Sequence, residues 1–235
     1  MNHPSVPAAV LFDLDGTLLD TPSAIADCLR TTLARSGRRA TDEELRATIG
    51  RPLNAVFAQL TGLPEEDPEV AEHVAGFRRA FREEAVPRAR DLIFPGVPEL
   101  LDRLADHGAQ LAIVTSKILP SAEELLHPAG LRSRFDTLIC HGMAPRGKPH
   151  PDLALLAAEC LGRRPEECVV VGDAVDDARM ARAAGMTSLG VTWGVGRAEE
   201  LTGAGAHSVV TDVPALAAAL DAFLSTRDAA LSLPT

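Results

Sequence analysis

Short apolar runs alternate with helix-like segments along most of this 235-residue chain. The runs have the length and the Val, Ile and Leu content of strands that are buried on both faces. They are AAVLF (8–12), QLAIVT (110–115), DTLIC (136–140), CVVVG (168–172) and TSLGVT (187–192). From about residue 95 to 224 the segments between them have a helical period, and several end in glycine. This alternation predicts a parallel sheet with helices on both faces.

The region from 21 to 90 breaks the alternation. It contains helix-like segments only, with Thr21 and Pro22 suited to start the first helix, and with Thr41 and Glu44 spaced as a capping box. We therefore predict an α/β fold in which a Rossmann-like doubly wound parallel sheet forms the core, made of residues 1–20 and 91–235. An inserted all-helical cap domain, residues 21–90, would be joined to it by two connections that act as a hinge. The last segment, 225–235, is expected to be a loose tail.

Composition excludes several classes of protein. The formal net charge is −10 and aromatic residues make up 3% of the chain, so neither a basic face nor a base-stacking platform for nucleic acid is expected. No apolar stretch approaches the ~20 residues of a membrane span, and no signal peptide is recognisable. The four cysteines are scattered and are expected to be reduced. We expect a cytoplasmic protein without a membrane or nucleic-acid partner; the pattern does not predict its oligomeric state.

Polar residues follow the predicted strands at the edge where open parallel sheets bind ligands. Asp13 ends the first run, Thr115 ends the second, and Asp173 follows CVVVG. Lys148 lies in the loop APRGKPHPD, before a predicted helix. These residues are expected to project from one edge of the sheet.

Crowded carboxylates at such an edge remain ionised most easily around a divalent cation. Mg²⁺ suits an incomplete cage of oxygen ligands that is completed by water and a phosphate oxygen, which predicts a phosphate-bearing substrate. Asp13 could then attack phosphorus as a nucleophile. Asp15, beyond a turn opened by Gly16, could protonate the leaving group and then activate water. The alternative for this short segment alone is a polar turn after a strand.

Four segments resemble, in order, the motifs of the haloacid dehalogenase-like superfamily. They are DLDGTLLD (13–20), Thr115 after LAIV, GKPHPD (147–152) and VVVGDAVDD (169–177). The helical region after the first motif is similar to the cap of the subfamily that includes phosphoglycolate phosphatases. The resemblance covers about residues 8 to 220.

The resemblance implies a role for each matching residue. Asp13 would be the nucleophile and a Mg²⁺ ligand, and Asp15 the general acid and base, whose backbone carbonyl also binds the metal. Thr115 would hydrogen-bond the phosphoryl group. Gly16 and Ser116 are further candidates for substrate binding, although relatives often have Asn where this chain has Ser116. Lys148 would offset the charge between nucleophile and phosphate. Asp173 and Asp177 would be the remaining metal-site acids, with Asp177 acting through water or by orienting Lys148.

Two further basic residues are candidates for substrate binding. Only Lys117 and Lys148 are lysines among the 23 Lys and Arg residues, and Lys117 lies two positions after Thr115. Lys117 could contact substrate or could be a solvated loop residue. Arg51, in a predicted loop between cap helices, could meet a carboxylate or phosphate of the substrate or could simply be a surface arginine.

The leading functional hypothesis is a Mg²⁺-dependent phosphatase that acts on a small phosphorylated metabolite, such as a phosphoglycolate-like compound or a sugar phosphate. A phosphotransferase of the phosphoglucomutase type is the second enzyme class. A non-catalytic binding protein on the same fold is the third possibility. The sequence does not identify the physiological substrate.

Overall fold

The computed structural model describes residues 8–231, with side chains described through residue 225. Six parallel strands form one sheet in the order β3-β2-β1-β4-β5-β6. Their bounds are β1 Ala9–Phe12, β2 Gln110–Thr115, β3 Thr137–Cys140, β4 Cys168–Gly172, β5 Thr187–Val191 and β6 Ser208–Val210. The order reverses beside β1, so this strand lies at the topological switch point where such sheets bind ligands. The predicted parallel α/β core is confirmed.

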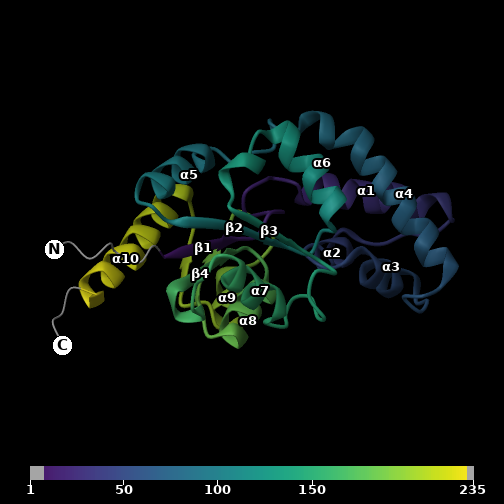
Figure 1. The fold of residues 1–235 in the computed structure, drawn as a ribbon. Coiled ribbons are helices and arrows are strands. Elements are labelled where there is room, and N and C mark those ends of the chain that lie inside the picture. Colours follow the sequence, from purple (N-terminus) through teal and green to yellow (C-terminus); the bar gives the residue numbers. More distant parts are fainter. Residues whose placement is uncertain (1–7, 232–235) are drawn as a thin grey trace.

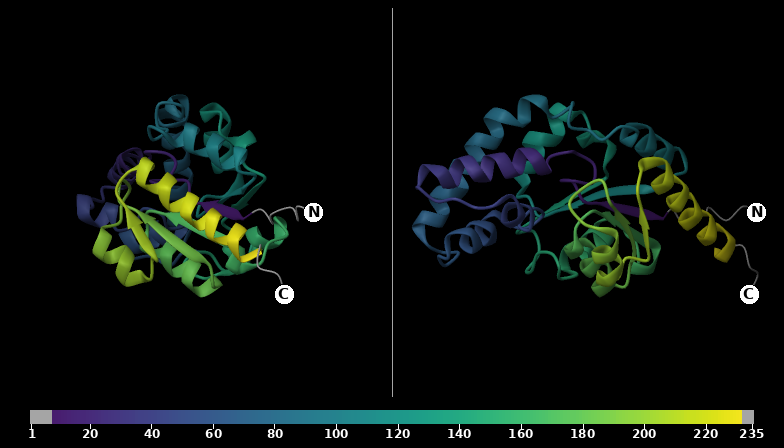
Figure 2. Two further views of the ribbon diagram at one scale, coloured as in Figure 1. Left: turned by 90° about the vertical axis from the view of Figure 1, so that its left-hand side faces the viewer. Right: turned by 180° about the vertical axis from the view of Figure 1, so that it is seen from behind.

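Helices cover both faces of the sheet (Figures 1 and 2). One face carries α5 (Val97–Asp106), α6 (Leu119–Ala129) and α10 (Val213–Leu231), and the other carries α7 (Asp152–Cys160), α8 (Val175–Ala184) and α9 (Ala198–Ala204). Alternate residues of β1 serve the two faces: Val10 and Phe12 pack in the cluster with α5, and Ala9 and Leu11 pack in the cluster with α7 and α8. The strands are therefore apolar throughout, as a doubly covered sheet requires.

Four helices follow β1 and lie beyond the carboxyl ends of the strands (Figure 1). They are α1 (Pro22–Arg35), α2 (Asp42–Arg46), α3 (Leu53–Thr61) and α4 (Pro68–Glu84). We call these four helices the cap helices. The predicted capping box of α2 is present, because the Glu44 amide donates to the Thr41 hydroxyl at 3.2 Å and the Thr41 amide donates to the Glu44 carboxylate at 2.7 Å.

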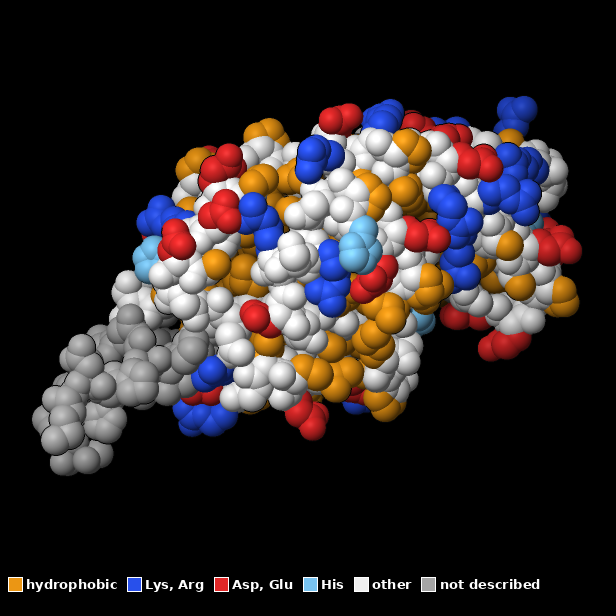
Figure 3. Space-filling model, turned by 45° about the horizontal axis from the view of Figure 1, so that its top comes forward, with side chains coloured by type: hydrophobic (Ala, Val, Ile, Leu, Met, Phe, Trp, Pro, Cys, Tyr) orange, Lys and Arg blue, Asp and Glu red, His pale blue; other side chains and the backbone are white. Residues whose placement is uncertain are grey.

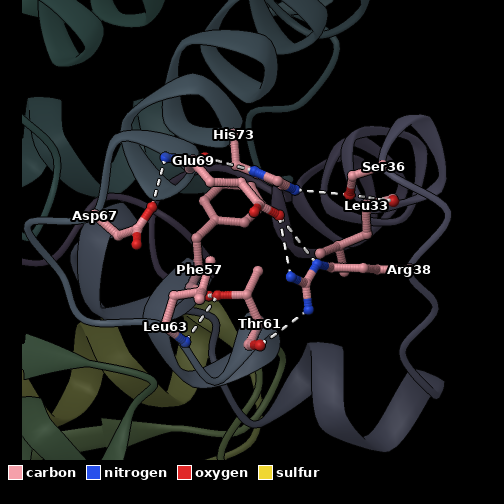
Figure 4. Close-up of polar contacts among 9 residues, drawn as sticks. All are labelled: Leu33, Ser36, Arg38, Phe57, Thr61, Leu63, Asp67, Glu69 and His73. Carbon is pink, nitrogen blue, oxygen red and sulfur yellow. Dashed lines mark hydrogen bonds and ion pairs between the residues drawn. The ribbon is translucent and has the colours of Figure 1, made fainter.

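A partly buried polar cluster links α1, α3 and α4 (Figure 4). His73 of α4 is buried, with Nε2 2.9 Å from the Ser36 hydroxyl and Nδ1 2.6 Å from the Glu69 carbonyl oxygen. Arg38 donates to the Glu69 carboxylate at 3.2 Å and to the Thr61 carbonyl at 3.0 Å. The segment that follows α1 is thereby fixed to both α3 and α4.

The two connections between the cap helices and the sheet lie against each other. Leu19 and Ile93 form an antiparallel bridge, the Asp20 amide donates to the Leu92 carbonyl at 2.7 Å, and the Phe94 amide donates to Leu18 at 3.1 Å. One buried hydrophobic cluster also continues from the sheet into the cap helices. The division into a core of 1–20 and 91–235 and a cap of 21–90, with a hinge between them, stays a prediction.

Two features differ from the expectations at the carboxyl-terminal end. The edge strand β6 was not predicted, because it spans three residues and only Val210 is buried, which leaves no apolar run to detect. The segment from 225 was expected to be loose, but α10 continues to Leu231; residues 232–235 lie outside the described part. The Ala-rich composition of α10 favours this extension.

The surface carries charges of both signs. Figure 3 shows acidic and basic side chains interspersed on the face it presents. Among residues 8–231, no helix is long and apolar enough to cross a membrane.

Candidate active site

Four loops at the carboxyl edge of the sheet bring the predicted core-site residues together. Asp13 follows β1, Thr115 ends β2, and Asp173 follows β4, while Lys148 comes from the loop after β3. Because β3, β2, β1 and β4 are adjacent in the sheet, their ends meet. Asp13, Thr115 and Asp173 are all buried.

Lys148 lies between two carboxylates. Its Nζ is 2.6 Å from an oxygen of Asp13 and 2.6 Å from an oxygen of Asp177, and the three side chains are 3%, 5% and 3% exposed. Burial alone would lower the pKa of Lys148, but the two carboxylates raise it above its ordinary value, so the ammonium stays charged. Asp177 thus contacts Lys148 directly, and its role in orienting Lys148 stays a prediction.

Asp13, Asp173 and Asp177 form a carboxylate cluster in which each offers an oxygen, and these oxygens lie within 4.8 Å of one another. Burial raises the pKa of Asp13 well above its usual value, and Lys148 only partly opposes this effect. Burial, together with the Asp177 charge, raises the pKa of Asp173 to about 7. Buried carboxylates that repel one another in this way form a donor set suited to a hard divalent cation. The cluster does not include the Asp15 carboxylate; metal binding through the Asp15 backbone carbonyl stays a prediction.

The Asp173 carboxylate is held in place by neutral donors. The Thr17 hydroxyl donates to one oxygen at 2.8 Å and the Val195 amide donates to the other at 2.9 Å. Gly16, with φ of +81°, and Gly194 lie so close to this carboxylate that a Cβ on either would overlap it. Gly16 therefore makes room for Asp173, and its predicted contact with substrate stays a prediction.

Asp15 points toward a different set of partners. One of its oxygens accepts a hydrogen bond from the Thr21 hydroxyl at 2.6 Å, and the other lies 3.1 Å from Nζ of Lys117. Thr21 was predicted to cap α1, but its side chain makes no capping hydrogen bond because the hydroxyl is used by Asp15. Lys117 also lies 4.5 Å from the centre of the Phe81 ring of α4, so this lysine contacts the cap helices rather than being a solvated loop residue.

A cavity separates the carboxyl edge of the sheet from the cap helices. From the sheet side, Asp13, Asp15, Thr115, Ser116, Lys117 and His141 line it; from the cap side the lining includes Arg51, Asn54, Val56, Phe77, Arg78 and Phe81. Asp13 belongs both to this lining and to the carboxylate cluster, so a group bound in the cavity can reach its free oxygen.

The polar side chains that line the cavity differ in whether they have hydrogen-bond partners. Thr115 accepts a hydrogen bond from the Lys117 amide at 3.1 Å, whereas Ser116 Oγ and His141 Nδ1 are buried without a partner. Arg51 is exposed and donates to Gln59, so the structure places it at the rim of the cavity. Sequence reasoning missed His141 and Arg78, because neither belongs to a motif and each reaches the cavity only through the packing of distant segments.

Comparisons with known proteins identify a family and several relatives of this chain. Residues 10–191 match the family model described as haloacid dehalogenase-like hydrolase. "Probable phosphatase IndB" of Dickeya dadantii (strain 3937) is 41% identical over 224 residues, which cover 95% of this chain and 97% of that protein. "Phosphoglycolate phosphatase" of Xylella fastidiosa (strain 9a5c) is 38% identical and covers 83% of this chain and 85% of its own length. "N-acetylmuramic acid 6-phosphate phosphatase" of Pseudomonas aeruginosa is 31% identical, with 88% and 91% covered.

Solved structures of other proteins are similar to this chain in fold. A hydrolase from Pseudomonas syringae has a TM-score of 0.82 and 27% identity, covering 92% of this chain and 98% of that one. A beta-phosphoglucomutase from Clostridium difficile has the same TM-score of 0.82 at 21% identity, covering 94% and 98%, and shows likeness of fold alone. The match over residues 10–191 spans most of the sequence and includes the first motif, Thr115, Lys148 and the metal-site acids. This chain therefore belongs to the haloacid dehalogenase-like hydrolase family.

Proposed function

We propose that this chain is a Mg²⁺-dependent phosphatase that hydrolyses a small phosphorylated metabolite through an aspartyl-phosphate on Asp13. The observation that carries the proposal is the position of Asp13, which pairs with Lys148 at 2.6 Å, belongs to the carboxylate cluster and lines the cavity. The proposed nucleophile therefore lines the cavity and also contacts a buried cation and two further buried carboxylates, none of which belongs to the lining.

The carboxylates of Asp13, Asp173 and Asp177 would hold the Mg²⁺ ion. Their fit rests on the grouping of their oxygens within 4.8 Å and on the mutual repulsion of the buried carboxylates, which a bound cation would relieve. When bound, Mg²⁺ supplies positive charge beside the phosphoryl oxygens and keeps the carboxylates ionised.

In the first step, an oxygen of Asp13 forms a bond to phosphorus while the bond from phosphorus to the ester oxygen breaks. Asp15 gives its proton to the departing oxygen, which leaves as an alcohol. Lys148 remains protonated and balances negative charge on the nucleophile and the phosphoryl group. Thr115, the last residue of β2, and Ser116, which follows it, would hydrogen-bond phosphoryl oxygens.

In the second step, Asp15 takes a proton from a water molecule as the water oxygen forms a bond to phosphorus. The bond between phosphorus and Asp13 breaks, which releases inorganic phosphate and restores the Asp13 carboxylate. Asp15 is protonated again and ready for the next leaving group. The cap helices would exclude bulk water from these steps.

The substrate class is supported by the relatives' names. Phosphoglycolate and N-acetylmuramic acid 6-phosphate, named for two of the relatives, are both phosphorylated carboxylic acids. The beta-phosphoglucomutase neighbour is similar in fold only, so no observation favours phosphotransfer over hydrolysis.

Phosphate release from 4-nitrophenyl phosphate and from a panel of phosphorylated metabolites tests the proposal. We expect Mg²⁺-dependent phosphate release by the native protein and none by Asp13→Asn. A melting temperature of Asp13→Asn close to that of the native protein would show that the variant is folded. Asp20→Asn is the matched control, because Asp20 is an exposed acid in the same motif segment. Full activity in Asp13→Asn would refute the mechanism, and transfer of phosphate to a second sugar hydroxyl without release would favour the phosphotransferase.

A further inference from the structure

Arg78 of α4 is a cation that faces the cavity without a partner. Its Nε is buried and forms no hydrogen bond. Three other ion pairs involve charged side chains of the described lining: Asp13 with Lys148, Asp15 with Lys117, and Glu124 with Arg82 at 3.0 Å. Arg51 is exposed and donates a hydrogen bond to the neutral amide of Gln59. The Arg78 side chain as a whole is half-buried, and its Nε is a buried hydrogen-bond donor that lacks an acceptor.

The surroundings of Arg78 strengthen its attraction for an anion. Phe77, Phe81 and Val56 line the same part of the cavity from the cap helices, with Ile25 and Leu29 of α1. The Arg78 side chain is half-buried, and the apolar walls beside it lower the local dielectric constant, which makes a charge in the cavity act more strongly. A cation that is left unpaired in such a place is suited to a ligand group that arrives with the substrate.

The cavity is lined from both the sheet and the cap helices, which we treat as its two ends. Asp13 and Thr115 lie on the sheet side, where the phosphate is expected, and Arg78 lies on the cap side. A substrate that spans them needs one group for each end. Within the described lining, the other cation without an acidic partner is Arg51, which is exposed and hydrogen-bonded to Gln59, so a group with a single negative charge suits Arg78 better than a second, doubly charged phosphate. Carboxylate also matches the planar, two-pronged geometry of guanidinium.

We propose that Arg78 binds a carboxylate on the leaving-group part of the substrate, and so selects phosphorylated carboxylic acids. This inference rests on the proposed function, whose reacting groups lie at the other end of the cavity. It assigns the charge selection to α4 rather than to Arg51, which is exposed and already donates to Gln59.

Two substrates that differ only at the far end test the proposal: 2-phosphoglycolate, and 2-hydroxyethyl phosphate, in which a hydroxymethyl group replaces the carboxylate. We expect Arg78→Gln to lower kcat/KM for phosphoglycolate about 10- to 100-fold more than for 2-hydroxyethyl phosphate, as loss of a charged hydrogen bond implies. Arg79→Gln is the matched control, because Arg79 is the next residue of the same helix and is exposed. If Arg78→Gln has a lower melting temperature than the native protein, Arg78→Lys is the second variant, because lysine keeps the charge but lacks the paired N–H donors of guanidinium.

Calorimetric titration of phosphoglycolate into Asp13→Asn, with and without Arg78→Gln, separates this proposal from the proposed function. Weaker binding in the double variant, with no phosphate released by the native protein, would uphold the carboxylate site and refute the phosphatase. Phosphate release with an equal effect of Arg78→Gln on both substrates would uphold the phosphatase and refute the carboxylate site. The absence of binding, or binding that is independent of Arg78, would also overturn the site.

Discussion

The ammonium of Lys117 lies 3.1 Å from the carboxylate of Asp15, and the two side chains are 13% and 9% exposed. The other oxygen of Asp15 accepts the Thr21 hydroxyl. The residue that we propose as the general acid and base is therefore oriented by a cation from the β2 loop and a hydroxyl from the start of α1. Because Lys117 also contacts Phe81, the orientation of Asp15 is linked to the position of α4.

Removal of this cation is expected to impair proton transfer. In Lys117→Met the Asp15 carboxylate loses a charged partner in a buried site, and we expect kcat to fall about tenfold or more, as the loss of a charged hydrogen bond implies. Steady-state phosphate release, with thermal melts to check folding, measures the effect. Lys117→Arg is the control that keeps the charge. An unchanged kcat in Lys117→Met would show that Asp15 needs no partner at this position.

Loss of the Asp15 carboxyl group is expected to separate the two chemical steps. Asp15→Asn cannot protonate a leaving group or activate water, but nitrophenolate leaves without a proton. We therefore expect a burst of nitrophenolate close to one equivalent per chain from 4-nitrophenyl phosphate, then turnover reduced about 10²- to 10⁴-fold. Rapid-mixing absorbance measures the burst, and acid quenching traps the phosphoenzyme. Rapid steady turnover without a burst would contradict the assignment.

Much of the fold could be predicted because it is encoded locally. The strands β2 and β4 coincide with the runs QLAIVT and CVVVG, since both faces of each strand are buried and the apolar run has no polar interruption. The edge strand β6 is half exposed, so it lacks that pattern. Thr21 shows another limit. A threonine before Pro22 suits a helix cap, but its hydroxyl donates a hydrogen bond to the carboxylate of Asp15 instead.

The sheet-side site could be predicted because its residues follow strands whose order a parallel sheet constrains. The cavity wall contributed by the cap helices could not be predicted. A helical pattern indicates which face of a helix is apolar, but not which other element that face packs against. Arg78 lies beside Phe77 in an ordinary amphipathic helix. Only the packing of α4 over the sheet edge brings its side chain to the cavity.

The ion pairs of Lys148 are expected to matter for stability as well as for chemistry. Lys148→Met would leave Asp13 and Asp177 buried without their cation, and breaking a buried pair from one side costs about 3–5 kcal/mol. We expect a lower melting temperature in EDTA and a larger stabilisation by Mg²⁺ than in the native protein. Differential scanning calorimetry with and without Mg²⁺ measures both. An equal response to Mg²⁺ in the two proteins would contradict the view that the ammonium and the metal neutralise the same carboxylates.

The cysteines are expected to differ sharply in reactivity. Cys28, Cys140 and Cys168 are buried, and burial raises the pKa of Cys28 and of Cys140 to about 11, whereas Cys160 is exposed. Since the thiolate is the reacting form, the native protein should react at one thiol per chain with a maleimide at neutral pH, and at four after denaturation. Mass spectrometry locates the label, and Cys160→Ser should remove the rapid reaction. Rapid labelling at Cys28 would show that α1 opens readily.

Binding of Mg²⁺ is expected to depend on pH through Asp173. Burial and the neighbouring Asp177 charge raise its pKa from 3.8 to about 7, and the raised pKa of Asp13 acts in the same direction, with Lys148 opposing it in part. A carboxyl group whose folded pKa is raised stabilises the protein below its unfolded pKa, and this contribution is lost as pH rises through the folded pKa. The metal-free protein should therefore lose stability from about pH 4 to pH 7.

Mg²⁺ must displace the Asp173 proton, so the apparent affinity for Mg²⁺ should rise about tenfold per pH unit over this range and level off above pH 7. Thermal melts across pH 5–8, with Mg²⁺ or with EDTA, give two curves of melting temperature against pH. The difference between the curves should change with pH in the native protein and should change less in Asp173→Asn. A difference that is constant with pH would refute the expected release of a proton from Asp173.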